Sequence, residues 1–129
     1  MPTLTPAATP ARLCELSVDV RTAVLLDAAG ALVACSDLDA ARANTLAAST
    51  RALLEAVDKV PGEPVEQVEV QVPGGAVYAS RSPRWTLAVV ARRNALSSLM
   101  LCDLRAVLGE LEGGAPIRRV SPGRGAAAA

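Results

Sequence analysis

The feature that most constrains the fold is an alternating segment in the middle of the chain, Val65-Glu-Gln-Val-Glu-Val-Gln-Val72. From position 68 onwards every second residue is valine, and the residues between the valines are polar. A period of two is typical of a β-strand with one buried face and one wet face. No proline interrupts the segment, so an unpaired edge here would invite aggregation. We therefore expect this strand to lie in a sheet and to find a partner.

Four further segments are predicted to be strands. Two of them flank a short turn that ends in Gly30, and two follow the turn at Pro73-Gly-Gly75. Glycine relieves the steric cost of a left-handed turn position, so both turns favour hairpins. The last strand is apolar on both faces, which is typical of a central strand. The four ranges are 22–27, 31–35, about 76–82 and about 85–92.

Three helices are predicted, over about 10–17, 37–59 and 95–111. Thr9 is expected to cap the first helix and Asn94 the last, because short polar side chains satisfy the free backbone N–H groups there. Ser36 and Asp39 resemble a capping box for the middle helix, with Asp in place of the usual Glu or Gln. The long middle helix is expected to bury one stripe of its surface. That stripe consists of Leu38, Ala41, Leu46, Leu53 and Val57.

The element order is then α-β-β-α-β-β-β-α. It predicts an α+β fold with a five-stranded antiparallel sheet and the long helix packed on one face. We expect a flexible arm over residues 1–9, one domain over 10–112, and a disordered tail rich in Gly, Pro, Ala and Arg over 113–129. The length of 129 residues suits a single domain of this kind.

Composition argues against several classes of function. The 13 basic and 13 acidic residues balance, whereas a general nucleic-acid binder carries a basic excess. Histidine is absent, which excludes nucleophilic triads with a histidine base. Cys14, Cys35 and Cys102 lack metal-ligand spacing, and we expect them to be reduced and mostly buried. No apolar run is long enough to cross a membrane. These features predict a cytoplasmic protein without catalytic residues, cofactor or metal.

Two stretches of the sequence resemble a known family. Ala23-Val-Leu-Leu-Asp27-Ala-Ala-Gly30, with an Asp three residues before the turn glycine, looks like the first hairpin of the roadblock family of dynein light chains. Leu87-Ala-Val-Val-Ala91, followed by Asn94-Ala-Leu-Ser-Ser-Leu-Met100, looks like that family's last strand and final helix. The resemblance covers about residues 10–112 and points to the bacterial branch that regulates small GTPases.

The resemblance implies a dimer, either of two identical chains or with a similar chain. In this family the third strand and the long helix of each subunit meet their counterparts and form one continuous sheet. Pairing with a second copy would also remove the exposed edge of the 65–72 strand. The implied interface comprises Val65, Gln67, Val68, Glu69, Val70, Gln71, Leu46, Ser49 and Leu53.

The resemblance also implies a non-catalytic scaffold or regulator that docks a small Ras-like GTPase. Candidate docking residues for an acidic partner are Arg42, Arg81, Arg84, Trp85, Arg92 and Arg93. A small-molecule sensor domain is the alternative, because several sensor folds combine a five-stranded antiparallel sheet with helices. The scarcity of aromatic and polar pocket residues argues against a sensor. The sequence leaves open which partner binds, and whether the protein activates, localises or tethers it.

Overall fold

The computed structural model describes residues 4–113 and has the predicted element order. Within this range there are three α-helices, and a short 3-10 helix, η1, precedes them. The helices are η1 (Pro6–Ala8), α1 (Thr9–Leu16), α2 (Ala40–Asp58) and α3 (Ser97–Leu111). The strands are β1 (Val20–Asp27), β2 (Leu32–Cys35), β3 (Gln67–Val72), β4 (Gly75–Arg81) and β5 (Trp85–Arg92).

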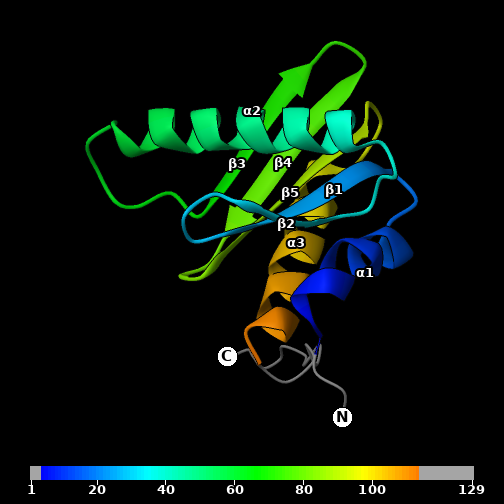
Figure 1. The fold of residues 1–129 in the computed structure, drawn as a ribbon. Helices are drawn as coiled ribbons and strands as arrows, with labels where there is room; N and C mark the ends of the chain where they lie inside the picture. The colour runs from blue at the N-terminus through cyan, green and yellow to red at the C-terminus, as the bar shows by residue number, and fades with distance from the viewer. Residues whose placement is uncertain (1–3, 114–129) are drawn as a thin grey trace, which may run out of the picture.

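All five strands form one antiparallel sheet in the order β2-β1-β5-β4-β3. The strand that is apolar on both faces, β5, lies at the centre as predicted, and β3 and β2 are the edges. Figure 1 shows α2 on one side of the sheet and α1 and α3 on the other. The α+β class, the five-stranded antiparallel sheet and the long helix on one face are therefore confirmed.

The alternation within β5 explains how one sheet supports two cores. Successive side chains of a strand point to opposite faces. Leu87 and Val89 pack with Leu104 in the core beneath α1 and α3, whereas Ala88 packs with Ala43 of α2 in the second core. The small side chains of the second core let α2 lie close to the sheet.

The helix α2 covers the sheet unevenly. It packs mainly over β1, β5 and β2. The side chains of Val68, Val70 and Val72 in β3 point toward the α2 side of the sheet. They are nevertheless only half-buried. The face of β3 is thus apolar but only partly covered.

Two glycines of the hairpins occupy positions that other residues would fill badly. Gly30 in the β1–β2 turn and Gly74 in the β3–β4 turn have φ of 88° and 84°, the left-handed region that glycine favours. Gly75 has a different constraint, because a Cβ there would lie 2.4 Å from the carbonyl oxygen of Ala91 on β5. The central sheet therefore depends on a close backbone approach at Gly75.

The predicted helix caps differ from those in the structure. The cap of α1 is Ala8, whereas Thr9 is fully buried and its hydroxyl donates to the carbonyl of Thr5 at 2.8 Å. The cap of α3 is Leu96, because Asn94 lies within a turn in which the N–H of Ala95 bonds to the carbonyl of Arg92. The predicted capping box of α2 is also wrong, because Ser36 accepts from the N–H of Ala23 in β1 and Asp39 itself caps the helix, accepting from the N–H groups of residues 41 and 42.

The predicted stripe of α2 is partly wrong. The helix begins only at Ala40, so Leu38 precedes it and is fully exposed. Ala41 is exposed as well, whereas Leu46 is buried, and Leu53 and Val57 are half-buried. The buried residues of α2 are Ala43, Leu46, Ala47 and Thr50. The buried stripe is rotated from the prediction because the small side chains of Ala43 and Ala47, and not Leu53 and Val57, face the core between α2 and the sheet.

The chain ends differ in what the structure describes. Of the residues expected to belong to a flexible arm, 6–9 are helical, because they form η1 and the first residue of α1. Of the predicted tail over 113–129, only Gly113 is described, and residues 114–129 lie outside the described range. The domain boundaries at 10 and 112 remain predictions.

Candidate interaction surfaces

The free edge of β3 exposes a defined set of backbone groups. The N–H of Arg81 donates to the carbonyl of Glu66 at 2.9 Å, so these two residues form a hydrogen-bonded pair of the β3–β4 ladder. Hydrogen-bonded and non-hydrogen-bonded pairs alternate along an antiparallel ladder. The even-numbered residues over 68–72 therefore point their N–H and C=O groups toward β4. The odd-numbered residues over 67–71 point theirs outward, toward the free edge.

The side chains of β3 alternate in the same way, as the sequence predicts: the odd-numbered residues carry polar side chains on one face of the sheet, and the even-numbered ones carry valines on the other. The polar ones face α3: Gln67 donates to the carbonyl of Leu101 at 2.9 Å, and Ser97 donates to Glu69 at 2.8 Å. The Nε2 of Gln71 donates to the same Glu69 carboxylate at 2.7 Å. The valines face the α2 side. The edge thus has an apolar side and a hydrogen-bonding side.

The two flanks of α2 differ. Arg51 donates to the carbonyl of Gly30 at 2.7 Å, which turns its flank toward the β1–β2 turn. By helical spacing Ser49, Leu53 and Ala56 lie on the opposite flank, where Ser49 and Ala56 are exposed and Leu53 is half-buried. Small exposed side chains allow another helix to approach closely.

One predicted interface residue is misplaced. Leu46 has 4% of its surface exposed and packs in the protein's own core between α2 and the sheet. It therefore cannot contact a second subunit without leaving that core. The other predicted interface residues of α2 and β3, together with Val65 just before β3, are exposed or half-buried.

The candidate docking arginines do not form one patch. Arg84 and Arg92 lie at opposite ends of β5, roughly 25 Å apart for a strand of this length. Arg42, at the start of α2, donates to Asp37 at 3.1 Å, and Arg81 bonds to Asp58. Sequence proximity is misleading here because a strand carries neighbouring residues apart.

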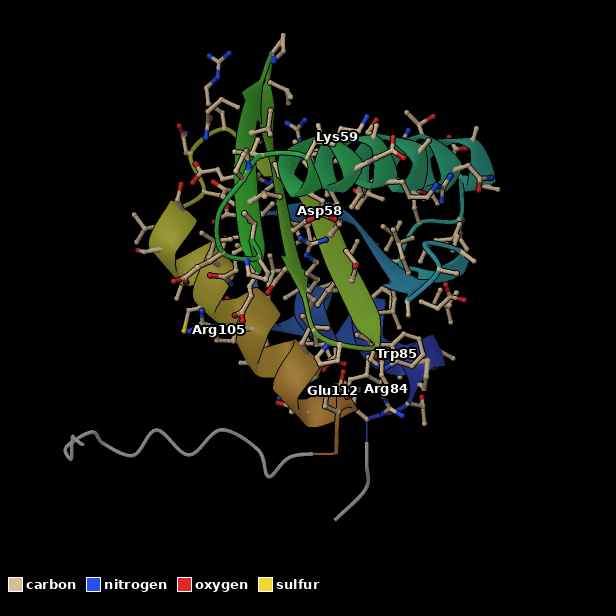
Figure 2. The ribbon with its side chains drawn as sticks, turned by 90° about the vertical axis from the view of Figure 1, so that its left-hand side faces the viewer. Asp58, Lys59, Arg84, Trp85, Arg105 and Glu112 are labelled. Atoms are coloured by element: carbon tan, nitrogen blue, oxygen red, sulfur yellow. The ribbon has the colours of Figure 1, made fainter. Side chains whose placement is uncertain are left out.

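Arg84 and its neighbours tie the β4–β5 turn to the end of α3. Arg84 Nε lies 3.2 Å from the Glu112 carboxylate, which also accepts a hydrogen bond from Ser82. These two contacts lower the pKa of Glu112, that from Ser82 being the larger cause. Figure 2 shows Arg84, Trp85 and Glu112 together at this end of the molecule. The predicted docking residues at this end thus act within the fold.

The Asp58–Arg81 pair predicts a specific acid sensitivity. Hydrogen bonding to Arg81 holds the pKa of Asp58 below its ordinary value. A carboxyl with a depressed folded-state pKa adds stability above its unfolded pKa of about 4, and this stability is lost as pH falls through the folded value. We expect Asp58→Asn to be less stable than the wild type near neutral pH and to lose less stability on acidification.

Urea midpoints measured from about pH 7 down to pH 3, at fixed protein concentration, check this prediction. Glu63→Gln is the matched control, because Glu63 is exposed and makes no ion pair within residues 4–113. Parallel midpoint curves for Asp58→Asn and the wild type would show that the pair contributes nothing.

A groove runs beside the N-terminal end of β3. It has a volume of about 470 Å³ and lies between the segment 64–66, the β4–β5 turn and the C-terminal half of α3. Its lining includes Val65 and Leu108, with Arg105 on its rim. Arg105, labelled on α3 in Figure 2, donates to the side chain of Gln67 on β3 at 3.5 Å. The groove continues the free edge of β3 along α3.

The cysteines lie in unexpected places. Cys35 and Cys102 are exposed and Cys14 is half-buried, so the expectation that they are mostly buried is wrong. Cys35 ends the edge strand β2, and Cys102 lies on the outer side of α3. Among residues 4–113, no group of three or more His, Cys, Asp and Glu side chains is placed to hold a metal ion. Within the same range, no helix combines the length and apolarity needed to cross a bilayer.

The family model for the Roadblock/LC7 domain matches residues 12–91. A Roadblock/LC7 domain from Streptomyces avermitilis has a TM-score of 0.74 at 21% identity, over 85% of this chain and 97% of that one. MglB of Myxococcus xanthus has a TM-score of 0.64 at 16% identity, over 82% and 90%. A profilin of Schizosaccharomyces pombe has 0.58 at 13% identity, over 84% and 98%. No curated protein matches the chain significantly.

These structural likenesses, at 21% identity or less, show the fold and carry no partner with them. The family match has a different weight, because it spans more than half of the chain. It runs from within α1 into β5 and includes α2 and the β3 edge. The chain therefore belongs to the Roadblock/LC7 domain family.

Proposed function

We propose that the protein is a non-catalytic cytoplasmic scaffold that forms a homodimer through β3 and α2 and docks a small Ras-like GTPase. The observation that carries the dimer is the free edge of β3, which joins three outward-facing residues to a half-covered valine face. Membership of the Roadblock/LC7 family supports the same assembly. The GTPase as partner rests on the resemblance to the bacterial branch of that family.

The energetics favour self-association at this edge. A buried valine contributes about 1.5–3 kcal/mol, so completing the burial of a half-buried valine adds on the order of 1 kcal/mol. Three such valines on each copy, with the new backbone hydrogen bonds, give an interface that can offset part of the cost of association. The small residues on the flank of α2 leave room for the α2 of a second copy.

The docking surface for the GTPase is proposed at the end of β5 that carries Arg92 and Arg93. Both side chains are exposed and make no ion pair within residues 4–113. Their positive charge is therefore available to an acidic surface. Arg42, Arg81 and Arg84 are each paired with a carboxylate of the same chain, so they are weaker candidates.

Binding to purified Ras-like GTPases from the same genome tests the proposal. Each GTPase is loaded with GDP or a non-hydrolysable GTP analogue, and its dissociation constant is measured by fluorescence anisotropy. We expect at least one GTPase to bind, and Arg93→Glu to weaken that binding roughly tenfold, as loss of one interface anchor does.

Lys59→Glu is the matched control, because it makes the same charge change beside the Asp58–Arg81 pair, at the far end of the sheet. Failure of every GTPase to bind in either nucleotide state would contradict docking. Equal weakening by Arg93→Glu and Lys59→Glu would contradict the assigned surface.

A further inference from the structure

We infer that two copies of the chain pair their β3 strands in one register, with Val70 of both copies on the two-fold axis. The inference rests on the proposed homodimer and names its geometry. It follows from the direction of the backbone groups of β3, from its charges and from the positions of its valines.

The backbone directions limit the registers. Hydrogen bonds between copies require outward-pointing groups on both strands, and these belong to the odd-numbered residues over 67–71. Odd residues of one copy must then lie opposite odd residues of the other. In a symmetric antiparallel pair this places one residue opposite itself, on the axis. The residues near the middle of β3 that can take this place are Val68, Glu69, Val70 and Gln71.

Charge distinguishes the two registers centred nearest the middle of β3, which have Glu69 or Val70 on the axis. With Glu69 on the axis, the Glu69 carboxylates of both copies lie directly opposite each other, and like charges in that position destabilise a sheet. With Val70 on the axis, Glu69 lies opposite Gln71 of the second copy. An amide donor and a carboxylate suit each other, as the 2.7 Å hydrogen bond between Gln71 and Glu69 within one chain shows. The register centred on Val70 therefore repeats a contact that the chain already makes.

The valines favour the same register. With Val70 on the axis, Val68 lies opposite Val72 of the second copy, so every valine of β3 meets a valine on the α2 face. A shift of the axis to Val68 sets Val70 opposite Glu66, and a shift to Glu69 sets Val72 opposite Glu66. Cross-strand pairs of β-branched residues stabilise a sheet, whereas a carboxylate opposite valine loses hydration.

Pro73 excludes the remaining candidate. Proline has no N–H to donate to a ladder. With Gln71 on the axis, Pro73 lies opposite Glu69, within the paired stretch, and Val68 lies opposite Gly74. With Val70 on the axis, Pro73 lies opposite Gln67, at the end of β3, where the pairing stops.

Disulfide trapping tests the register. Single cysteines are placed at positions 68, 69, 70 and 71 in a background with Cys14→Ala, Cys35→Ser and Cys102→Ser. We expect Val70→Cys to form a covalent dimer at least roughly tenfold faster than the others. Facing residues of a non-hydrogen-bonded pair have Cα atoms about 4.5 Å apart, within the range of a disulfide, whereas diagonal neighbours are about 7–8 Å apart.

Two further measurements support the comparison of cross-linking rates. Thiol reactivity with a maleimide corrects each rate for exposure. A mixture of Val68→Cys and Val72→Cys proteins should cross-link between the two variants and hardly within either one, which tests the register even when Val70→Cys folds poorly.

The outcomes separate the register from the proposed function. A cysteine-free protein that is monomeric by light scattering at all concentrations would overturn the homodimer and the register together. A dimer that cross-links fastest through Val68→Cys, Glu69→Cys or Gln71→Cys would overturn the register and leave the homodimer intact. A dimer that cross-links through none of the four positions would show that β3 lies outside the interface.

Discussion

Gln71→Pro should convert the dimer into a folded monomer. The N–H of Gln71 points away from β4 toward the free edge, so proline removes a donor to the second copy and leaves the β3–β4 ladder intact. By symmetry two intermolecular hydrogen bonds are lost, and the proline ring crowds the edge. We expect the dimer dissociation constant to rise on the order of a hundredfold. Light scattering across concentrations measures the mass, and circular dichroism checks the fold.

Val70→Pro and Gln71→Ala are the controls. Val70 points its N–H toward β4, so proline there should destabilise the subunit itself as well as the dimer. Gln71→Ala keeps the backbone donor and should stay dimeric at concentrations where Gln71→Pro is monomeric. A Gln71→Pro protein that remains as dimeric as the wild type would place the interface elsewhere.

Gly75→Ala should be the most destabilising single-methyl addition in the sheet. The new Cβ would lie 2.4 Å from the carbonyl oxygen of Ala91, and because that atom belongs to the backbone of β5 it cannot swing away. We expect a loss of about 3 kcal/mol in the free energy of unfolding, the upper part of the range for overpacking. Urea unfolding at fixed protein concentration measures the loss.

Gly109→Ala is the matched control because it adds the same methyl group inside α3, where nothing lies within 4 Å of the new Cβ. Alanine in a helix interior is favoured over glycine by about 1 kcal/mol, so this variant should gain stability. Equal effects of Gly75→Ala and Gly109→Ala would contradict the close approach of β4 and β5 at Gly75.

The sheet was predictable because its signals are local. Alternation in β3, apolar character on both faces of β5 and a glycine in each hairpin turn all act over a few residues. The caps at Thr9 and Asn94 failed because tertiary contacts decide where α1 and α3 start. Thr9 is drawn into the core, and α3 starts at Ser97, whose hydroxyl bonds to Tyr78 at 3.0 Å.

The candidate site was predictable only in part. The sequence identifies β3 as an edge in need of a partner, but it groups arginines that the structure separates along β5. The predicted interface includes Gln67, Glu69 and Gln71, but the outward direction of their backbone groups was not predicted, although a signal for it exists. Pro73-Gly74 is a two-residue turn, and such a turn is closed by a hydrogen-bonded pair, here Val72 and Gly75. Counting back from that pair gives the parity of every residue in the strand.

The position of β5 between β1 and β4 has a consequence for how the chain folds. The strands β3, β4 and β5 are joined by short turns, whereas Val24 of β1 pairs with Ala88 across most of the domain. Closing so long a loop costs more entropy than closing a turn, so the meander of β3 to β5 should form first. During synthesis the apolar strand β1 can pair with β2, but its other edge stays unpaired until β5 has emerged. That interval is when the nascent chain is most exposed to aggregation and most dependent on chaperones.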